Sequence, residues 1–132
     1  MSEPIADLSR SLDEAAALIL SSSYVVVLAG AGLSVESGIP PFRGPGGLWT
    51  KYGEPTNLSY HEFTKDPKEW WEARFRNEDR PGDPTYELKV AVDQARPNPG
   101  HHALVEMEDM GLLKCVITQN VDNLHREAGS NS

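Results

Sequence analysis

Two stretches of this sequence gather glycine, hydroxyl, amide and carboxylate groups, and each directly follows an apolar run. The first begins with GAG at residues 30–32, after the apolar residues 24–29. Glycines without a Cβ atom let a phosphate approach backbone N–H groups, which can donate hydrogen bonds to it. The second stretch begins with QNVD at residues 119–122, after the apolar run 112–118. Its amide and carboxylate groups can recognise a polar ligand through directed hydrogen bonds.

The glycine turn satisfies only half of the usual dinucleotide fingerprint. That fingerprint is G-x-G-x-x-G, with an acidic residue about 20 positions later at the end of a second strand. Here Val35 occupies the third glycine position, and no acidic residue follows at a strand end. Taken alone, residues 30–32 therefore fit either an ordinary tight turn or a nucleotide-dependent oxidoreductase with a half-formed fingerprint.

The composition excludes several function classes. The chain has 132 residues and a formal charge of −8, which argues against nucleic acid as a partner. Its single cysteine, Cys115, can form neither an internal disulfide nor a paired zinc site. No apolar stretch approaches the roughly 20 residues that cross a bilayer. We expect a soluble, cytoplasmic protein with no membrane partner.

The apolar pattern predicts alternating helices and strands. Ser11 fits the start of a capping box that opens a helix over residues 12–21, after a loose lead-in over residues 1–10. Asn98 fits the N-cap of another helix, which Gly111 ends. The other expected elements are a strand over 24–29, a long loop over 30–51, short helical pieces over 60–77 interrupted at Pro67, a helix over 85–95, a strand over 112–118 and a short helix over 122–128.

Both expected strands carry apolar residues on both faces, which is typical of strands covered on both sides in a parallel sheet. A sheet usually has about four to six strands, and two cannot cover each other. We therefore expect further strands beyond Ser132 or in another chain. The predicted fold class is α/β, a Rossmann-like parallel sheet with flanking helices that is incomplete in these 132 residues. Residues 11–132 would form the N-terminal part of this domain.

The two stretches together resemble the signature motifs of the sirtuins, a family of NAD-dependent protein lysine deacylases. The pattern G-A-G-x-S-x-x-S-G-I-P-x-F-R is matched over residues 30–43, and T-Q-N-[IV]-D-x-L-H-x-x-A-G over residues 118–129. GLW at 47–49 and PNPGHHAL at 97–104 lie between them in the family's order. An ordinary oxidoreductase does not explain the second block.

The resemblance implies an NAD-dependent protein lysine deacetylase. Such an enzyme transfers the acyl group of an acetylated-lysine protein or peptide to ADP-ribose and releases nicotinamide. Sirtuins also carry a small zinc module with four cysteines, so zinc is expected in a full-length parent but has no ligands here. The alternative is a non-catalytic module that binds NAD or ADP-ribose.

By this similarity, NAD contacts both motifs. Gly30 and Gly32 would approach the diphosphate, while Asp122 would accept a hydrogen bond from the nicotinamide carboxamide. Phe42 would shield the reactive face after nicotinamide leaves, and Arg43 would reach a phosphate or stabilise the loop. The implied catalytic residues are Asn120, Asp122 and Phe42. The implied cofactor-binding residues are Gly30, Ala31, Gly32, Ser34, Ile39, Phe42, Arg43, Gln119, Asn120, Val121 and Asp122.

Simpler structural roles stay open for several of these residues. Asp122 could cap the helix over 122–128, Phe42 could be core packing, and Arg43 could form an ion pair within its loop. His125 belongs to the motif but is not the family's general base, so we expect it to make structural hydrogen bonds.

Three departures from the family pattern shape the expected activity. The general-base histidine, in a His-Gly pair shortly after the second motif, is absent, so these 132 residues alone should have little or no deacetylase activity. Pro41 stands where many sirtuins have Asp, and proline removes an N–H and stiffens the loop. Our alignment places Ala73 and Arg76 at the Tyr and Arg positions of the deacylases for acidic acyl groups, which favours acetyl over succinyl.

Overall fold

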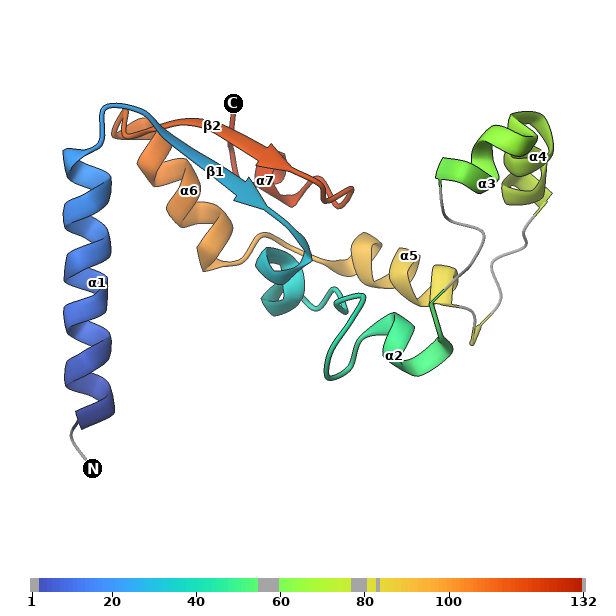
Figure 1. Ribbon diagram of the computed structural model, residues 1–132, viewed down its shortest axis with the longest axis horizontal. Helices are drawn as coiled ribbons and strands as arrows, with labels where there is room; N and C mark the ends of the chain where they lie inside the picture. Colours follow the sequence, from blue (N-terminus) through green and yellow to red (C-terminus); the bar gives the residue numbers. More distant parts are fainter. Residues whose placement is uncertain (1–2, 55–59, 77–80, 83, 132) are drawn as a thin grey trace. The chain divides into compact units, whose positions relative to one another are not determined.

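The computed structural model describes residues 3–54, 60–76, 81–82 and 84–131 (Figure 1). Contacts between residues divide the chain into two compact units, residues 1–33 with 97–132 and residues 34–96. The elements of the first unit are α1 (Glu3–Ser21), β1 (Val25–Ala29), α6 (Pro99–Asp109), β2 (Leu113–Thr118) and α7 (Leu124–Glu127). Those of the second unit are α2 (Leu48–Tyr52), α3 (Tyr60–Lys65), α4 (Pro67–Arg76) and α5 (Pro84–Gln94). The 3-10 helix η1 (Ala31–Ser37) carries the chain from the first unit into the second.

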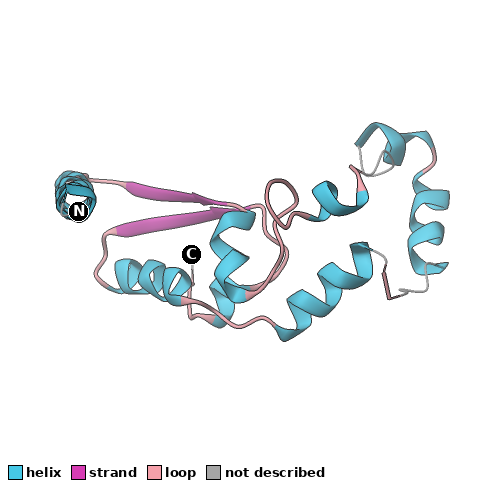
Figure 2. Cartoon of the chain, turned by 90° about the horizontal axis from the view of Figure 1, so that it is seen from below, coloured by secondary structure: helices cyan, strands magenta, loops and turns pink. Residues whose placement is uncertain are grey.

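The first unit is built on a two-stranded parallel sheet of β1 and β2, which lie side by side in Figures 1 and 2. Val27 pairs with Val116, and Ala29 pairs with Thr118, so the two strands end level with each other. The β-branched residues of both runs favour this extended backbone. The predicted strands and the predicted parallel α/β arrangement are therefore confirmed.

The prediction that both strands are covered on both faces is wrong for the described residues. Alternate residues of a strand point to opposite faces, and α6 packs against β2. Ala29 and Val116 are buried, whereas Val26, Leu28 and Ile117 are 42, 73 and 52% exposed. An apolar run shows which side chains can be buried, but not which elements lie over them. Further strands that would cover the exposed face stay a prediction.

The expected lead-in over residues 1–10 is helical from Glu3 onward, which corrects the predicted helix start; residues 1 and 2 lie outside the described part. A proline such as Pro4 is tolerated in a first turn, where its missing N–H has no partner to lose. Arg10 Nε donates to Glu14 Oε1 at 2.9 Å, one turn further along α1. Ser11 therefore lies inside the helix and does not cap it.

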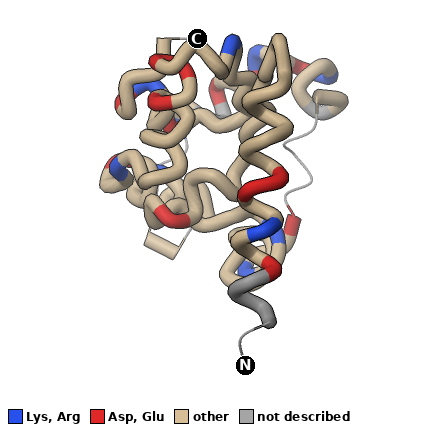
Figure 3. Tube along the Cα trace, turned by 90° about the vertical axis from the view of Figure 1, so that its left-hand side faces the viewer, with Lys and Arg blue, Asp and Glu red and all other residues tan. Residues whose placement is uncertain are grey.

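The remaining helices follow the sequence closely. The helical pieces over 60–77 are α3 and α4, and the break falls at Pro67, where α4 begins. The predicted loop over 30–51 is partly helical, because it contains η1 and the first residues of α2. Acidic and basic residues are interspersed along the trace (Figure 3). None of the helices in the described part of the chain has the length and apolar character that a membrane crossing requires.

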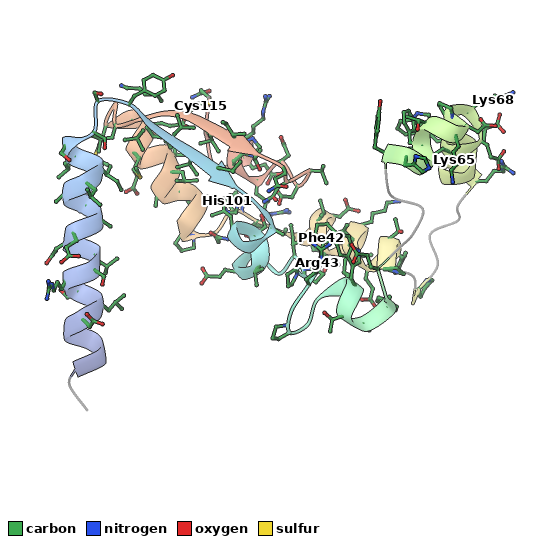
Figure 4. The ribbon with its side chains drawn as sticks, in the orientation of Figure 1. Phe42, Arg43, Lys65, Lys68, His101 and Cys115 are labelled. Carbon is green, nitrogen blue, oxygen red and sulfur yellow. The ribbon has the colours of Figure 1, made fainter. Side chains whose placement is uncertain are left out.

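Asn98 caps α6 as predicted. Its Oδ1 accepts hydrogen bonds from the N–H groups of Gly100 at 2.8 Å and His101 at 3.3 Å. In return, His101 Nδ1 accepts from the Asn98 N–H at 3.3 Å, which completes a capping box. His101, labelled in Figure 4, is 1% exposed and must be neutral at Nδ1 to accept this bond.

The buried His101 should make the unfolding free energy depend on pH. Burial lowers the pKa of His101 from its ordinary value of 6.5; Asp122 opposes this shift, and His125 and His102 add to it. Because the unfolded chain then takes up a proton before the folded chain does, stability should fall as the pH drops below about 6.5. The measurement is the thermal unfolding midpoint between about pH 7.5 and about pH 5.5.

His101→Gln is the matched variant for this test. Glutamine is a preferred partner at this position of a capping box, and it cannot be protonated. We expect the variant to fold and to lose most of the pH slope in that interval. A variant with the same slope as the parent would show that His101 is not the group responsible.

Candidate functional site

The first part of the site lies at the carboxyl end of the two-stranded sheet. The Gln119 N–H donates to the Ala29 carbonyl at 3.2 Å and so extends the strand pairing beyond β2. One residue later, Asn120 Nδ2 donates to the Gly30 carbonyl at 3.0 Å, and the Asn120 N–H donates to Thr118 Oγ1 at 3.0 Å. The residues that follow β1 and β2 are therefore held together by direct hydrogen bonds.

The glycine turn leaves open space at Gly32. A Cβ atom built at Gly32 meets no heavy atom within 4 Å, and the φ angle of Gly32 lies outside the left-handed region. Neither packing nor backbone conformation therefore requires glycine at this position. A Cβ at Gly30 would make an ordinary contact of 3.4 Å with Gln119 Nε2. The open surface at Gly32 fits a ligand that approaches the backbone closely.

Asp122 has the structural role that the sequence left open. Its Oδ1 accepts a hydrogen bond from the Leu124 N–H at 3.0 Å, at the start of α7. Asn123 between them has a φ of +64°, and Leu124 is anchored in the core at 1% exposure. This bond fixes the half-buried carboxylate on a rigid element, as a pre-organised binding group requires. Neighbouring Val121 is 88% exposed.

The second unit holds Phe42 and Arg43 against Trp49. The rings of Phe42 and Trp49 lie 5.0 Å apart between centroids, and Arg43 Cζ lies 4.3 Å from the centroid of the Trp49 ring. Arg43 Nη2 also forms an ion pair of 2.7 Å with Glu54 Oε1. Phe42 and Arg43 are labelled side by side in Figure 4. Arg43 therefore forms an ion pair, as the alternative expected, but its partner lies beyond the predicted loop over residues 30–51.

Backbone hydrogen bonds fold this loop onto itself. The Leu48 N–H donates to the Pro41 carbonyl at 2.9 Å, and the Trp49 N–H donates to the Phe42 carbonyl at 2.8 Å. Pro41 takes part through its carbonyl, so its missing N–H removes no bond of this pair. Gly47 is buried at the tightest point, where a Cβ would lie 2.8 Å from both the Phe42 carbonyl oxygen and the Arg43 carbonyl carbon.

The predicted site residues thus fall into two groups, each within its own unit. The first group comprises Gly30, Ala31, Gly32, Gln119, Asn120, Val121 and Asp122; the second comprises Ser34, Ile39, Phe42 and Arg43. Ser34 and Ile39 are 1% and 6% exposed, and their contact with a cofactor stays a prediction. In the described ranges, no three His, Cys, Asp or Glu side chains are grouped as metal ligands.

Glu54 is the contact that the sequence did not reveal. It lies eleven residues from Arg43 and outside both motifs, so no local pattern links the two. The nearest signal is Gly53, whose φ of +85° returns the chain after α2.

Gly47→Ala should disrupt the loop that carries Phe42 and Arg43. The added Cβ would lie within 3.0 Å of three backbone atoms, which cannot move aside as a flexible side chain can. We expect a loss of about 1–3 kcal/mol in unfolding free energy, measured by chemical denaturation. Gly44→Ala is not a neutral control, because Gly44 has a φ of +84°; Thr50→Ala, which removes only a side-chain bond to the Gly44 carbonyl, serves better. Equal stability of Gly47→Ala and the parent would contradict the described loop.

The chain is similar to curated protein deacylases and to solved Sir2 structures. The chain is 47% identical over 119 residues to the NAD-dependent protein deacylase of Pyrococcus abyssi, covering 89% of this chain and 42% of that protein. It matches a solved Sir2 homologue mutant in complex with ADP ribose at 46% identity and a TM-score of 0.60, over 86% of this chain and 41% of that one. A solved complex of Sir2 with a p53 peptide and NAD+ matches at 34% identity and a TM-score of 0.60, over 90% and 42% of the two chains.

The chain spans less than half the length of the relatives that it matches. The match to the Sir2 family model nevertheless extends over residues 30–132, which includes both motifs and every residue assigned to the site. With the parallel strand pair and its hydrogen-bonded ends, this match establishes that the chain belongs to the Sir2 family.

Proposed function

We propose that this chain supplies the NAD-binding part of an NAD-dependent protein lysine deacetylase. The observation that carries the proposal is the 3.0 Å hydrogen bond from Asn120 Nδ2 to the Gly30 carbonyl. This bond joins the glycine turn to the QNVD segment at residues 119–122, which carries the amide and carboxylate side chains. The names of the relatives support it, since they refer to NAD-dependent deacylation and to complexes with ADP ribose and NAD+.

The glycine turn is proposed to receive the diphosphate of NAD. Backbone N–H groups after a strand are suited to an anion, and the open space at Gly32 leaves room for one. When bound, NAD supplies the ribose carbon that accepts the acyl group, while this chain orients that carbon. Asn120 is held beside this turn by its bond to Gly30 and is proposed to hydrogen-bond the ribose hydroxyls.

Asp122 is proposed to hold the nicotinamide carboxamide. An ionised carboxylate is an acceptor for the carboxamide N–H₂ group, a role that an apolar residue cannot perform. Phe42 is proposed to exclude water from the reacting carbon, with its ring supported by Trp49. Arg43 is proposed to bind a phosphate of NAD through its guanidinium.

A short neutral acyl group, such as acetyl, is the proposed substrate modification. Arg76 is the residue aligned with the arginine that reads acidic acyl groups, and its Nη2 donates to Glu69 at 3.0 and 3.1 Å. Its charge is therefore partly neutralised within α4.

The proposed substrate is an acetylated-lysine protein or peptide, and the proposed location is the cytoplasm. Zinc would be held outside these 132 residues, which contain one cysteine.

The binding of NAD and of ADP-ribose to the purified protein, measured by calorimetry, tests this proposal. ADP-ribose lacks nicotinamide, so Asp122→Asn should weaken NAD binding about tenfold and change ADP-ribose binding little. Asparagine keeps an Oδ1 atom that can accept from the Leu124 N–H, which protects the start of α7. Asp93→Asn, an exposed change of equal charge on α5, is the control. An equal loss for both ligands would place Asp122 away from nicotinamide.

Gly32→Ala should separate ligand binding from folding. The conformation of Gly32 is open to alanine, so the unfolding free energy should stay within about 1 kcal/mol of the parent or rise. Affinity for ADP-ribose should fall at least about tenfold, because the methyl group occupies the diphosphate's approach. A variant that binds ADP-ribose as tightly as the parent would contradict the assignment of the diphosphate to this turn.

The 132 residues alone should bind NAD without turning over an acetylated peptide. Their four histidines are His61, His101, His102 and His125, and none stands in the His-Gly pair of the family's general base. Turnover is measured by incubating the chain with NAD and an acetyl-lysine peptide and monitoring nicotinamide release by mass spectrometry. Steady release by a mass-verified chain of this length would contradict the expectation, and release by a longer form with that histidine would distinguish the enzyme from the alternative, a non-catalytic binding module.

A further inference from the structure

The guanidinium of Arg43 is already engaged in two directions. Its Cζ atom lies 4.3 Å from the centroid of the Trp49 ring, and its Nη2 atom pairs with Glu54 Oε1 at 2.7 Å. The side chains of Arg43 and Glu54 are 70% and 61% exposed, so solvent and a ligand can both reach the pair. The Trp49 ring attracts this cation, and Glu54 occupies one of its donor groups.

The turn after α2 is what brings Glu54 to this position. Gly53 ends α2 with a φ of +85°, a conformation that favours glycine, and its N–H donates to the Trp49 carbonyl at 3.0 Å. The next residue, Glu54, thereby returns to Arg43. The segment from Phe42 to Glu54 thus closes on itself through both backbone bonds and the ion pair.

We propose that Glu54 is an internal competitor of the phosphate of NAD for Arg43 and so weakens cofactor binding in this protein. The inference rests on the proposed function, in which Arg43 binds that phosphate. A carboxylate and a phosphate both accept from the guanidinium's donors, and Nη2 cannot serve both fully. Glu54 also leaves a negative charge beside an anionic ligand, which raises the free energy of the bound state.

The expected effect is modest, because the pair is exposed. Exposed ion pairs contribute little in water, so removing the charge of Glu54 should tighten ADP-ribose binding by about two- to fivefold. Screening by salt should reduce the difference, since the Debye length falls from about 30 Å at 0.01 M to about 3 Å at 1 M. A neutral ligand, adenosine, should show no difference.

The experiment measures ADP-ribose and adenosine binding to the parent, Glu54→Gln and Glu54→Ala by calorimetry at about 0.01 M and about 1 M salt. Glu14→Gln is the matched control, because Glu14 accepts from Arg10 at 2.9 Å in a similarly exposed pair on α1. Both Glu54 variants should bind ADP-ribose more tightly than Glu14→Gln does, and mainly at low salt. Glutamine preserves the shape of glutamate, and thermal unfolding of both variants checks that the loop still folds.

Four outcomes would overturn the inference. Unchanged affinity in both Glu54 variants would show that the pair does not compete with the ligand. Weaker binding would show that Glu54 positions Arg43 for the phosphate. An equal gain in Glu14→Gln would assign the effect to net charge alone. Failure of the parent to bind ADP-ribose at either salt concentration would count against the proposed function itself, and the inference would fall with it.

Discussion

The parallel pairing of β1 with β2 is the constraint on which the first unit depends. Ala29 and Thr118 end the strands at the same level, and the pairing continues through the Gln119 N–H to the Ala29 carbonyl. Asn120 then uses its side chain in place of the backbone to hold the Gly30 carbonyl at 3.0 Å. Two motifs about 90 residues apart are joined because parallel strands bring their carboxyl ends to one edge. The same Gly30 carbonyl also accepts from the Leu33 N–H at 3.0 Å.

A different device organises the second unit. The described residues of this unit form helices and loops but no strand. Gly47 instead lets the chain that carries Phe42 and Arg43 pack against its own backbone. Trp49 then supports both side chains, and Glu54 pairs with the cation. A tie between elements adds to this unit: Lys51 donates to Glu87 at 2.8 Å, and this hydrogen bond raises the pKa of Lys51 and lowers that of Glu87.

The sequence predicted best what neighbouring residues decide. The cap at Asn98, the helix stop at Gly111 and the break at Pro67 each follow from one residue and its near neighbours.

The sequence was a poorer guide to features that depend on residues far apart in the chain. Ser11 was expected to cap a helix, but the helical spacing on its N-terminal side overrides that preference. Leu28 was expected to be buried, and its 73% exposure depends on which elements lie over the sheet. The strand ends placed Gly30 and Asn120 at one edge, whereas no pattern placed Glu54 near Arg43.

The account's central claim is that the glycine turn and the QNVD segment bind one ligand together. The most direct measurement is a titration of the isotopically labelled chain with ADP-ribose, followed through its backbone amide NMR signals. Residues 30–32 and 119–122 should shift together and yield the same dissociation constant. Shifts confined to one of these two segments, or two different constants, would contradict the claim.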